Sequence, residues 1–171
     1  MEDLGTRLET NRAALAGLRE AVERGEPWPL SEAYGAEPES EWGPKEVLAH
    51  VAEMVPYWLG QIESVIAAPS EPVPFGRVAT DSTRIERIGR DRSLPAGELF
   101  DRLDRAAADL GDRLRGLDGA ALRRRGVHVR LGEMTVEGMA ERFIVGHLEE
   151  HVRQLEEILA AGRGGESDQA G

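Results

Sequence analysis

The stretch FIVGHLEEHVRQLEEIL, residues 143–159, decides the fold because it joins a long helical repeat to two histidines one turn apart. Apolar residues recur here every three or four positions, which is typical of one face of an amphipathic α-helix. Thr135 can cap the N-terminus of this helix, which is predicted to reach about residue 161. The inward stripe is expected to contain Val136, Met139, Ala140, Phe143, Ile144, His147, His151 and Ile158.

Three further segments, at about residues 3–24, 44–68 and 95–117, show the same periodicity, and stretches rich in proline and glycine separate them. Four amphipathic helices predict an all-α four-helix bundle. Residues 69–94 are expected to form a long connection with a short helix around residues 82–90. The alternation of Val127, Val129 and Leu131 predicts a brief extended segment before the last helix.

The length of 171 residues, with 40% hydrophobic residues, is that of one domain with a real core. We expect this domain to span residues 1–162. The polar, glycine-rich tail at residues 163–171 is predicted to be disordered.

The charge balance argues against two classes of partner. With 32 acidic and 21 basic residues, the formal net charge of −11 would repel a nucleic-acid backbone. No apolar run approaches the roughly 20 residues that span a bilayer, and the acidic N-terminus does not resemble a signal peptide. We therefore expect a cytoplasmic protein that binds neither nucleic acid nor membrane.

His147 and His151 lie at positions i and i+4 of the last helix, so their rings project side by side as cis ligands of a metal would. His50 lies at the edge of the apolar stripe of the second helix, formed by Val47, Val51, Met54, Trp58, Ile62 and Val65. The chain has no cysteine, so any metal must be held by nitrogen and oxygen. The sequence predicts a metal site at His50, His147 and His151. The alternative is that each histidine is a core residue hydrogen-bonded to a neighbour.

Several other residues could have a role in chemistry. His128 follows a glycine in a predicted loop and is expected to be exposed to solvent. Trp42, Tyr57 and Trp58 are expected to pack in the core. Glu150 could support a histidine or carry a proton, although a solvated glutamate is the favoured interpretation. Leu148 occupies the position where a zincin helix needs its glutamate, which disfavours a peptidase of that type.

The segment WGPKEVLAHVAEMVPYW, residues 42–58, followed by residues 143–159, resembles the DinB/YfiT-like superfamily. That superfamily includes metal-dependent thiol transferases and mycothiol-dependent maleylpyruvate isomerases. The resemblance covers about residues 4–161. It implies that His50, His147 and His151 bind a divalent metal, zinc or nickel. It also implies an up-up-down-down bundle with a long crossover between the second and third helices, and a possible homodimer.

The leading hypothesis is a transferase that activates a low-molecular-weight thiol, such as mycothiol or bacillithiol, toward a small electrophilic substrate. Because the chain has no cysteine, the nucleophile must come from outside the protein. Two alternatives stay open. One is a metal-dependent hydrolase. The other is a non-enzymatic bundle that binds a small ligand or a partner, with a structural metal or none.

Overall fold

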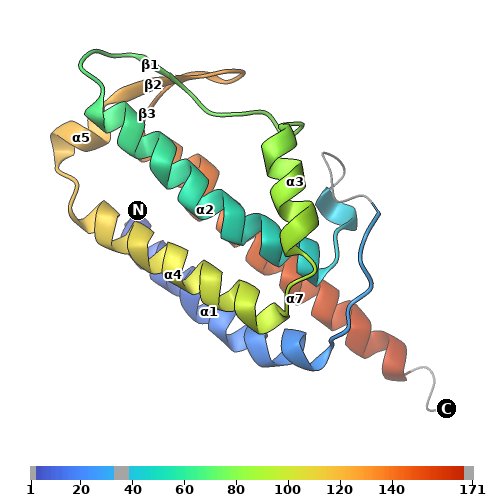
Figure 1. The fold of residues 1–171 in the computed structure, drawn as a ribbon. Coiled ribbons are helices and arrows are strands. Elements are labelled where there is room, and N and C mark those ends of the chain that lie inside the picture. The colour runs from blue at the N-terminus through green and yellow to red at the C-terminus, as the bar shows by residue number, and fades with distance from the viewer. Residues whose placement is uncertain (1–2, 33–38, 168–171) are drawn as a thin grey trace.

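The computed structural model describes residues 3–32 and 39–167, and the side chains of these up to residue 162. Four long helices pack side by side (Figure 1): α1 (Leu4–Arg24), α2 (Pro44–Ala67), α4 (Ala96–Arg115) and a continuous last helix. That last helix comprises α6 (Val136–Ala140), a π turn (Glu141–Val145) and α7 (Gly146–Ser167). The predicted all-α four-helix bundle is confirmed. α7 extends past residue 161, where the sequence predicted its end, and residues 168–171 of the expected tail lie outside the described residues.

The connections, as far as the structure describes them, contain shorter elements: η1 (Glu39–Glu41), α3 (Ser82–Asp91), α5 (Gly119–Arg123) and three strands. The strands are β1 (Val73–Phe75), β2 (Arg125–His128) and β3 (Gly132–Thr135), in the order β1-β2-β3. β1 pairs in parallel with β2, so that Phe75 faces His128, and β2 pairs antiparallel with β3. The short helix of the long connection and an extended segment near residue 127 are confirmed. The partner strand β1 was not predicted.

The helix directions follow from contacts at the two ends of the bundle. Glu26, just after α1, accepts hydrogen bonds from Lys45 Nζ at the start of α2 (2.5 Å) and from Ala96 N at the start of α4 (2.9 Å). At the other end, Arg113 of α4 meets Glu63 of α2 at 3.2 Å. α2 and α4 therefore run parallel to each other and antiparallel to α1 (Figure 1).

The last helix runs antiparallel to α2, because His147 lies beside His50 while the earlier Phe143 stacks on the later Trp58. The order is thus up-down-down-up, and the up-up-down-down order expected from the resemblance is wrong. An up-up start needs a connection as long as the bundle between the first two helices, whereas here the chain turns back near Glu26. The expected long crossover between α2 and α4 is confirmed (Figure 1).

The core lies between the four helices. Every residue predicted for the α2 stripe is buried: Val47, Val51, Met54, Trp58, Ile62 and Val65. In the last helix the stripe shifts after the π turn, since that turn contains one residue more than an α-helical turn. The buried apolar residues there are Leu148, Val152, Leu155 and Leu159, and the predicted Ile158 is only partly buried. This shift places His147 at the edge of the buried face, with 29% of its side chain exposed.

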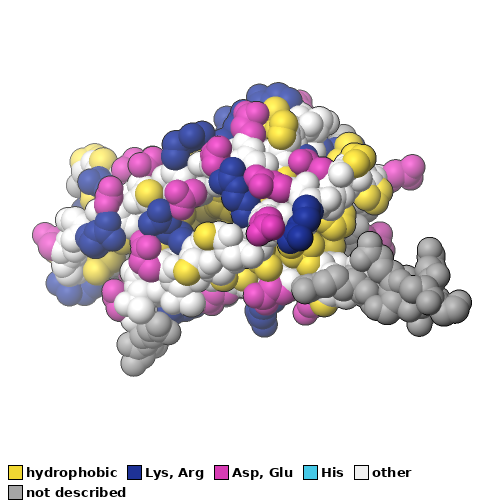
Figure 2. All heavy atoms as spheres, turned by 90° about the horizontal axis from the view of Figure 1, so that it is seen from below, with side chains coloured by type: hydrophobic (Ala, Val, Ile, Leu, Met, Phe, Trp, Pro, Cys, Tyr) yellow, Lys and Arg dark blue, Asp and Glu magenta, His cyan; other side chains and the backbone are white. Residues whose placement is uncertain are grey.

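The outer surface carries charges of both signs. Figure 2 shows basic and acidic side chains interspersed over the face seen from below, with small apolar areas between them. Ion pairs join α1 to α4, including Arg12 with Asp104 (2.8 Å) and Arg19 with Asp101 (2.6 Å). Within the described part of the chain, no helix is both long and apolar enough to cross a membrane.

Candidate metal centre

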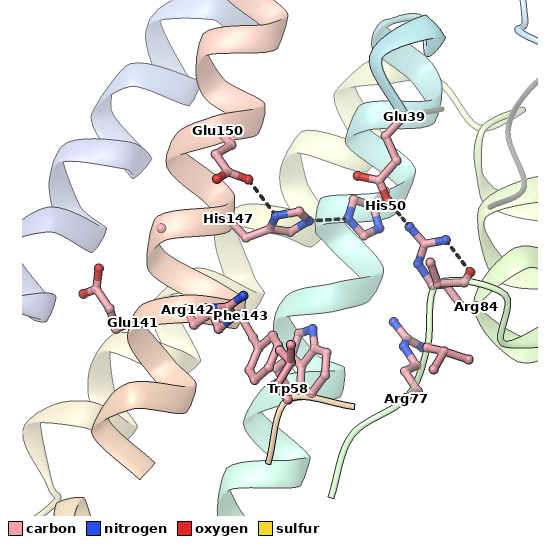
Figure 3. Close-up of a pocket in the computed structure, with 14 residues that line it drawn as sticks. Glu39, His50, Trp58, Arg77, Arg84, Glu141, Arg142, Phe143, His147 and Glu150 are labelled. Atoms are coloured by element: carbon pink, nitrogen blue, oxygen red, sulfur yellow. Dashed lines mark hydrogen bonds and ion pairs between the residues drawn. The ribbon is translucent and has the colours of Figure 1, made fainter. Parts of the chain in front are cut away.

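The three predicted histidines converge at the contact between α2 and α7, and Figure 3 shows the ring of His147 directed toward that of His50. His50 Nε2 lies 3.1 Å from His147 Nε2, which lies 3.2 Å from His151 Nε2. The amphipathic phase of α2 turns His50 inward, and the four-residue spacing on α7 brings the other two rings to the same point. The structure thus brings together all three residues that the sequence selected.

The second nitrogen of each α7 histidine has its own partner. His147 Nδ1 lies 3.1 Å from Glu150 Oε2, and His151 Nδ1 lies 2.9 Å from Gln154 Oε1. Both partners are acceptors, so each Nδ1 carries the proton. The orientation of the Gln154 amide is fixed, because its Nε2 donates to the backbone oxygen of Glu39 at 2.8 Å. The Glu150 carboxylate is 63% exposed, as the favoured solvated position predicts, and it also supports a ring of the site.

When both rings are neutral, the protons at Nδ1 leave His147 and His151 with the lone pairs of their Nε2 atoms facing each other across 3.2 Å. Two facing lone pairs repel unless a cation lies between them. Imidazole nitrogens about 2.0–2.1 Å from a common zinc ion are themselves about 3.0–3.4 Å apart, as found here. His50 Nδ1 is buried and has no hydrogen-bond partner, which does not fit a core histidine satisfied by its neighbours. The residues present therefore fit a divalent ion.

Burial keeps two of the rings neutral. It lowers the pKa of His50 well below the usual value, and unfavourable electrostatic interactions with His151 and Arg84 lower it further. Burial, followed by the electrostatic interaction with His147, lowers the pKa of His151 to about 3. Both rings are uncharged at neutral pH, which is the form that binds metals.

A fourth group that the sequence did not reveal lies beside the histidines. Glu39 Oε2 is 3.7 Å from His151 Nε2, and its other oxygen is held by Arg84. One ligand atom from each of Glu39, His50, His147 and His151 lies within 4.8 Å of the others. Glu39 had no distinguishing signal, because it sits among several glutamates in an irregular connection.

A pocket of about 660 Å³ opens onto this group. His50, His147 and Glu39 form part of its lining, together with Glu150. An aromatic wall faces them, in which Trp58 and Phe143 stack with ring centroids 4.3 Å apart. The remaining lining comes largely from the long crossover and the π turn and includes Arg77, Val78, Ala79, Arg84, Leu131, Glu141 and Arg142. The histidine group is therefore accessible from solvent on one side.

His128 is buried, so the expectation that it would be exposed is wrong. Its ring stacks on Phe143 at 5.0 Å, behind the aromatic wall, and its Nδ1 accepts from the backbone N–H groups of Arg130 and Leu131. The pairing of β2 with β1 turns this side chain inward, and such pairing between distant segments is invisible in the local sequence. His128 belongs to the packing of the pocket wall and lies outside the histidine group.

The aromatic residues of α2 divide between core and pocket. Trp42, just before α2, is buried, and its ring centroid lies 5.3 Å from that of His50 and 6.4 Å from that of His151. Tyr57 is partly buried and supports the guanidinium of Arg77 at 3.7 Å from its ring centroid. Trp58 is buried as predicted, yet one part of it lines the pocket. The core assignment of Trp42 and Trp58 is confirmed.

The model of the DinB superfamily matches residues 7–155. The chain belongs to the DinB superfamily. The match spans all four long helices and includes the three histidines and Glu39. It confirms the resemblance seen in the sequence.

A solved structure of the same superfamily has a similar fold. The chain is 18% identical to YfiT from Bacillus subtilis, described as a probable metal-dependent hydrolase with an unusual four-helix bundle topology. The TM-score is 0.71, and the alignment covers 94% of this chain and 87% of YfiT. At this identity the similarity establishes the fold alone. No curated protein sequence matches the chain significantly.

Proposed function

We propose that this DinB protein is a metal-dependent transferase in which His50, His147 and His151 hold a divalent ion, zinc or nickel. In this proposal a low-molecular-weight thiol, such as mycothiol or bacillithiol, attacks a small electrophile in the adjoining pocket. The observation that carries the proposal is the convergence of three Nε2 atoms at the base of an open pocket, with two lone pairs facing each other. Such a set leaves room for a ligand from solution, as catalytic sites do.

A divalent ion in this position would supply Lewis acidity, which lowers the pKa of a thiol or a water molecule that meets it. The role of the protein is to hold the ion and to orient the histidine rings that bind it. Glu150 and Gln154 fix the rings of His147 and His151 through their Nδ1 atoms. The Trp58 and Phe143 wall keeps one side of the pocket apolar, which strengthens electrostatic interactions inside it.

The charges along the pocket are mostly paired within the protein. Arg77 forms a two-point ion pair with the buried Glu53, at 2.5 and 2.6 Å, and Arg84 pairs with Glu39. Arg142 is exposed at the opposite rim, on the π turn. It is the lining cation best placed to meet an anionic group of a thiol or a substrate, since the other two are held by carboxylates.

A second candidate is a metal-dependent hydrolase, which would use the same three histidines with water in place of the thiol. Two observations favour it: the description of YfiT as a probable metal-dependent hydrolase, and the carboxylates of Glu39 and Glu150 in the pocket lining. A carboxylate beside the reacting water could accept its proton.

The experiment that tests the proposal begins with elemental analysis of untagged protein purified without chelator, beside His147→Ala and the pocket variant Glu141→Gln. We expect near-stoichiometric metal in the wild type and Glu141→Gln and its loss in His147→Ala. A chain that carries no metal and takes up neither zinc nor nickel would refute the site.

Activity then separates the two enzymes and the non-enzymatic alternative. Metal-loaded protein is assayed for thiol consumption with a panel of electrophiles, and for ester and amide hydrolysis without thiol. Thiol consumption that disappears in His147→Ala supports the transferase, and hydrolysis alone supports the second candidate. A loaded protein with neither activity, and with thiol binding no better than that of the metal-free form, would favour a structural metal. Each histidine variant should then lose much of its thermal stability.

A further inference from the structure

The position of Glu39 is fixed from two sides, although it lies in an irregular connection. Its backbone oxygen accepts a hydrogen bond from Gln154 Nε2, and the same amide holds His151 through Oε1. One side chain thus sets both the orientation of a histidine and the place of the glutamate beside it. The distance between Glu39 and the histidines is therefore built into the contact between η1 and α7.

Arg84 fixes the carboxylate itself. This residue lies on α3, is 4% exposed, donates from Nη1 to the oxygen of Ala79 at 3.0 Å and lies over the ring of Trp42. Its Nη2 binds Glu39 Oε1 at 2.5 Å. Because Oε1 is occupied, Oε2 is the oxygen that faces His151, at 3.7 Å from Nε2, and Figure 3 shows the carboxylate between His50 and Arg84.

The pairing also sets the charge beside the histidines. A buried guanidinium without its carboxylate would repel a divalent ion across a short distance in a low-dielectric interior. Glu39 neutralises Arg84 and leaves one oxygen with unused lone pairs on the histidine side. Ligand atoms of one ion lie about 3–4 Å apart, and the Oε2 to Nε2 distance falls in that range.

We infer that Glu39 supplies the fourth protein ligand of the proposed ion, through Oε2, and that Arg84 is the residue that positions it. This inference rests on the proposed metal at the three histidines. The resulting set of three nitrogens and one oxygen suits borderline divalent ions such as zinc, nickel and cobalt, which can expand their shell to take a further ligand from the pocket, and it disfavours soft monovalent copper. Arg84 acts here only through Glu39.

The test uses cobalt and zinc with the full metal-free chain and four proteins: wild type, Glu39→Gln, Glu39→Asp and Glu141→Gln. Glu39→Asp keeps the charge but shortens the side chain by one methylene group. This variant therefore distinguishes direct binding of the ion by the carboxylate from an effect of its charge alone. Glu141→Gln removes another carboxylate that lines the same pocket. In the wild type this carboxylate forms an ion pair with Arg7. The readouts are zinc affinity by competition with a chelator and the visible absorption of bound cobalt, which reports its ligands. Melting temperatures of the metal-free variants check that each one folds.

We expect Glu39→Gln to weaken zinc binding by about 10–100-fold or more, since the loss of a residue that only supports a ligand already weakens metal binding by this factor. Both Glu39 variants should change the cobalt spectrum in the same way, and Glu141→Gln should match the wild type. Weaker binding with an unchanged spectrum would mean that Glu39 acts by charge alone, which overturns the inference. Unchanged binding and spectra in both variants would also overturn it, while the three-histidine site would stand. A wild type that binds no ion would overturn the proposed function itself.

Discussion

Gln154 shows how much a single polar side chain can determine in this site. Its two amide atoms join α7 to η1, one through His151 Nδ1 and the other through the backbone of Glu39. It does not belong to the group of four that could hold an ion. Its effect on metal binding is expected to come from fixing the tautomer of His151 and the position of Glu39.

Replacing this amide should therefore weaken the proposed metal site without removing a ligand. We expect Gln154→Ala to lower zinc affinity by about 10–100-fold, the usual cost of losing a residue that supports a ligand. Arg153→Ala is the matched control, because its side chain is exposed on the same turn of α7. The measurement is chelator competition at neutral pH, and equal affinities in the two variants would show that Gln154 has no such role.

The π turn sets the register of the last helix. It separates the buried stripe of α6, which contains Met139 and Ala140, from one that continues through Leu148 and Val152. Without the added residue His147 would point toward the centre of the core, as the sequence predicted. With it, the ring sits between α2 and the pocket. π turns are frequent at functional sites, and here the turn makes one histidine reachable from solvent.

The long crossover depends on the backbone conformation of Gly76, which follows β1 directly and lies beside the pocket wall. Its φ of 92° lies in the left-handed region, and its N–H donates to Gln61 Oε1 at 2.8 Å. A Cβ at this position would lie only 2.4 Å from Cδ2 of the buried His128. Both the backbone conformation and the space therefore require glycine here.

Gly76→Ala should accordingly destabilise the protein by about 2–4 kcal/mol, from the cost of the left-handed backbone together with overpacking against His128. Gly60→Ala is the control, because Gly60 lies within α2 and a Cβ there meets nothing within 4 Å. That substitution should stabilise by about 0.5–1 kcal/mol. Urea unfolding at neutral pH measures both changes, and a Gly76→Ala midpoint at or above that of the wild type would contradict the argument.

At the scale of the whole molecule, Glu26 ties three helices together at one end of the bundle. Its carboxylate binds Lys45, whose side chain is 7% exposed, and the backbone N–H of Ala96. The hydrogen bond from Lys45, followed by that from Ala96, lowers the pKa of Glu26 against the opposing effect of burial. These contacts are the ones that define the up-down-down-up order.

Glu26→Gln should lower the free energy of unfolding by about 1–3 kcal/mol at pH 7, because it leaves the Lys45 ammonium with the oxygen of Leu94 but without its anion. The folded pKa of Glu26 lies below its unfolded value of about 4.3, so the contribution is complete above that pH. This contribution to stability is lost as the pH falls through the folded pKa, so the free energies of unfolding of the wild type and the variant should converge in acid.

Urea unfolding at pH 7 and below pH 4 measures this difference. Glu20→Gln serves as the control, since Glu20 is 83% exposed and its pair with Arg24 should change stability by less than about 1 kcal/mol. The role assigned to Glu26 would be contradicted if the difference in free energy of unfolding between the wild type and Glu26→Gln stayed constant or grew as the pH fell.

The sequence by itself determined the features that depend on local periodicity. The apolar spacing of α2 and α7 set the helices and placed His50 and His151 on buried faces, and Thr135 caps α6 as expected by accepting from Gly138 N. Periodicity works for these features because burial along a helix depends on residues three and four positions apart. The family match and the similar fold of YfiT confirm the four-helix bundle.

Only the tertiary structure decided which distant segments meet. It set the helix directions, the pairing of β1 with β2 that buries His128, and the approach of Glu39 and Arg84 to the histidines. These outcomes depend on contacts between irregular connections, where no repeat records which residue faces inward. A bundle buries its stripes through local spacing, but its pocket is lined by whatever residues the connections bring there, and that choice is made only when the whole chain packs.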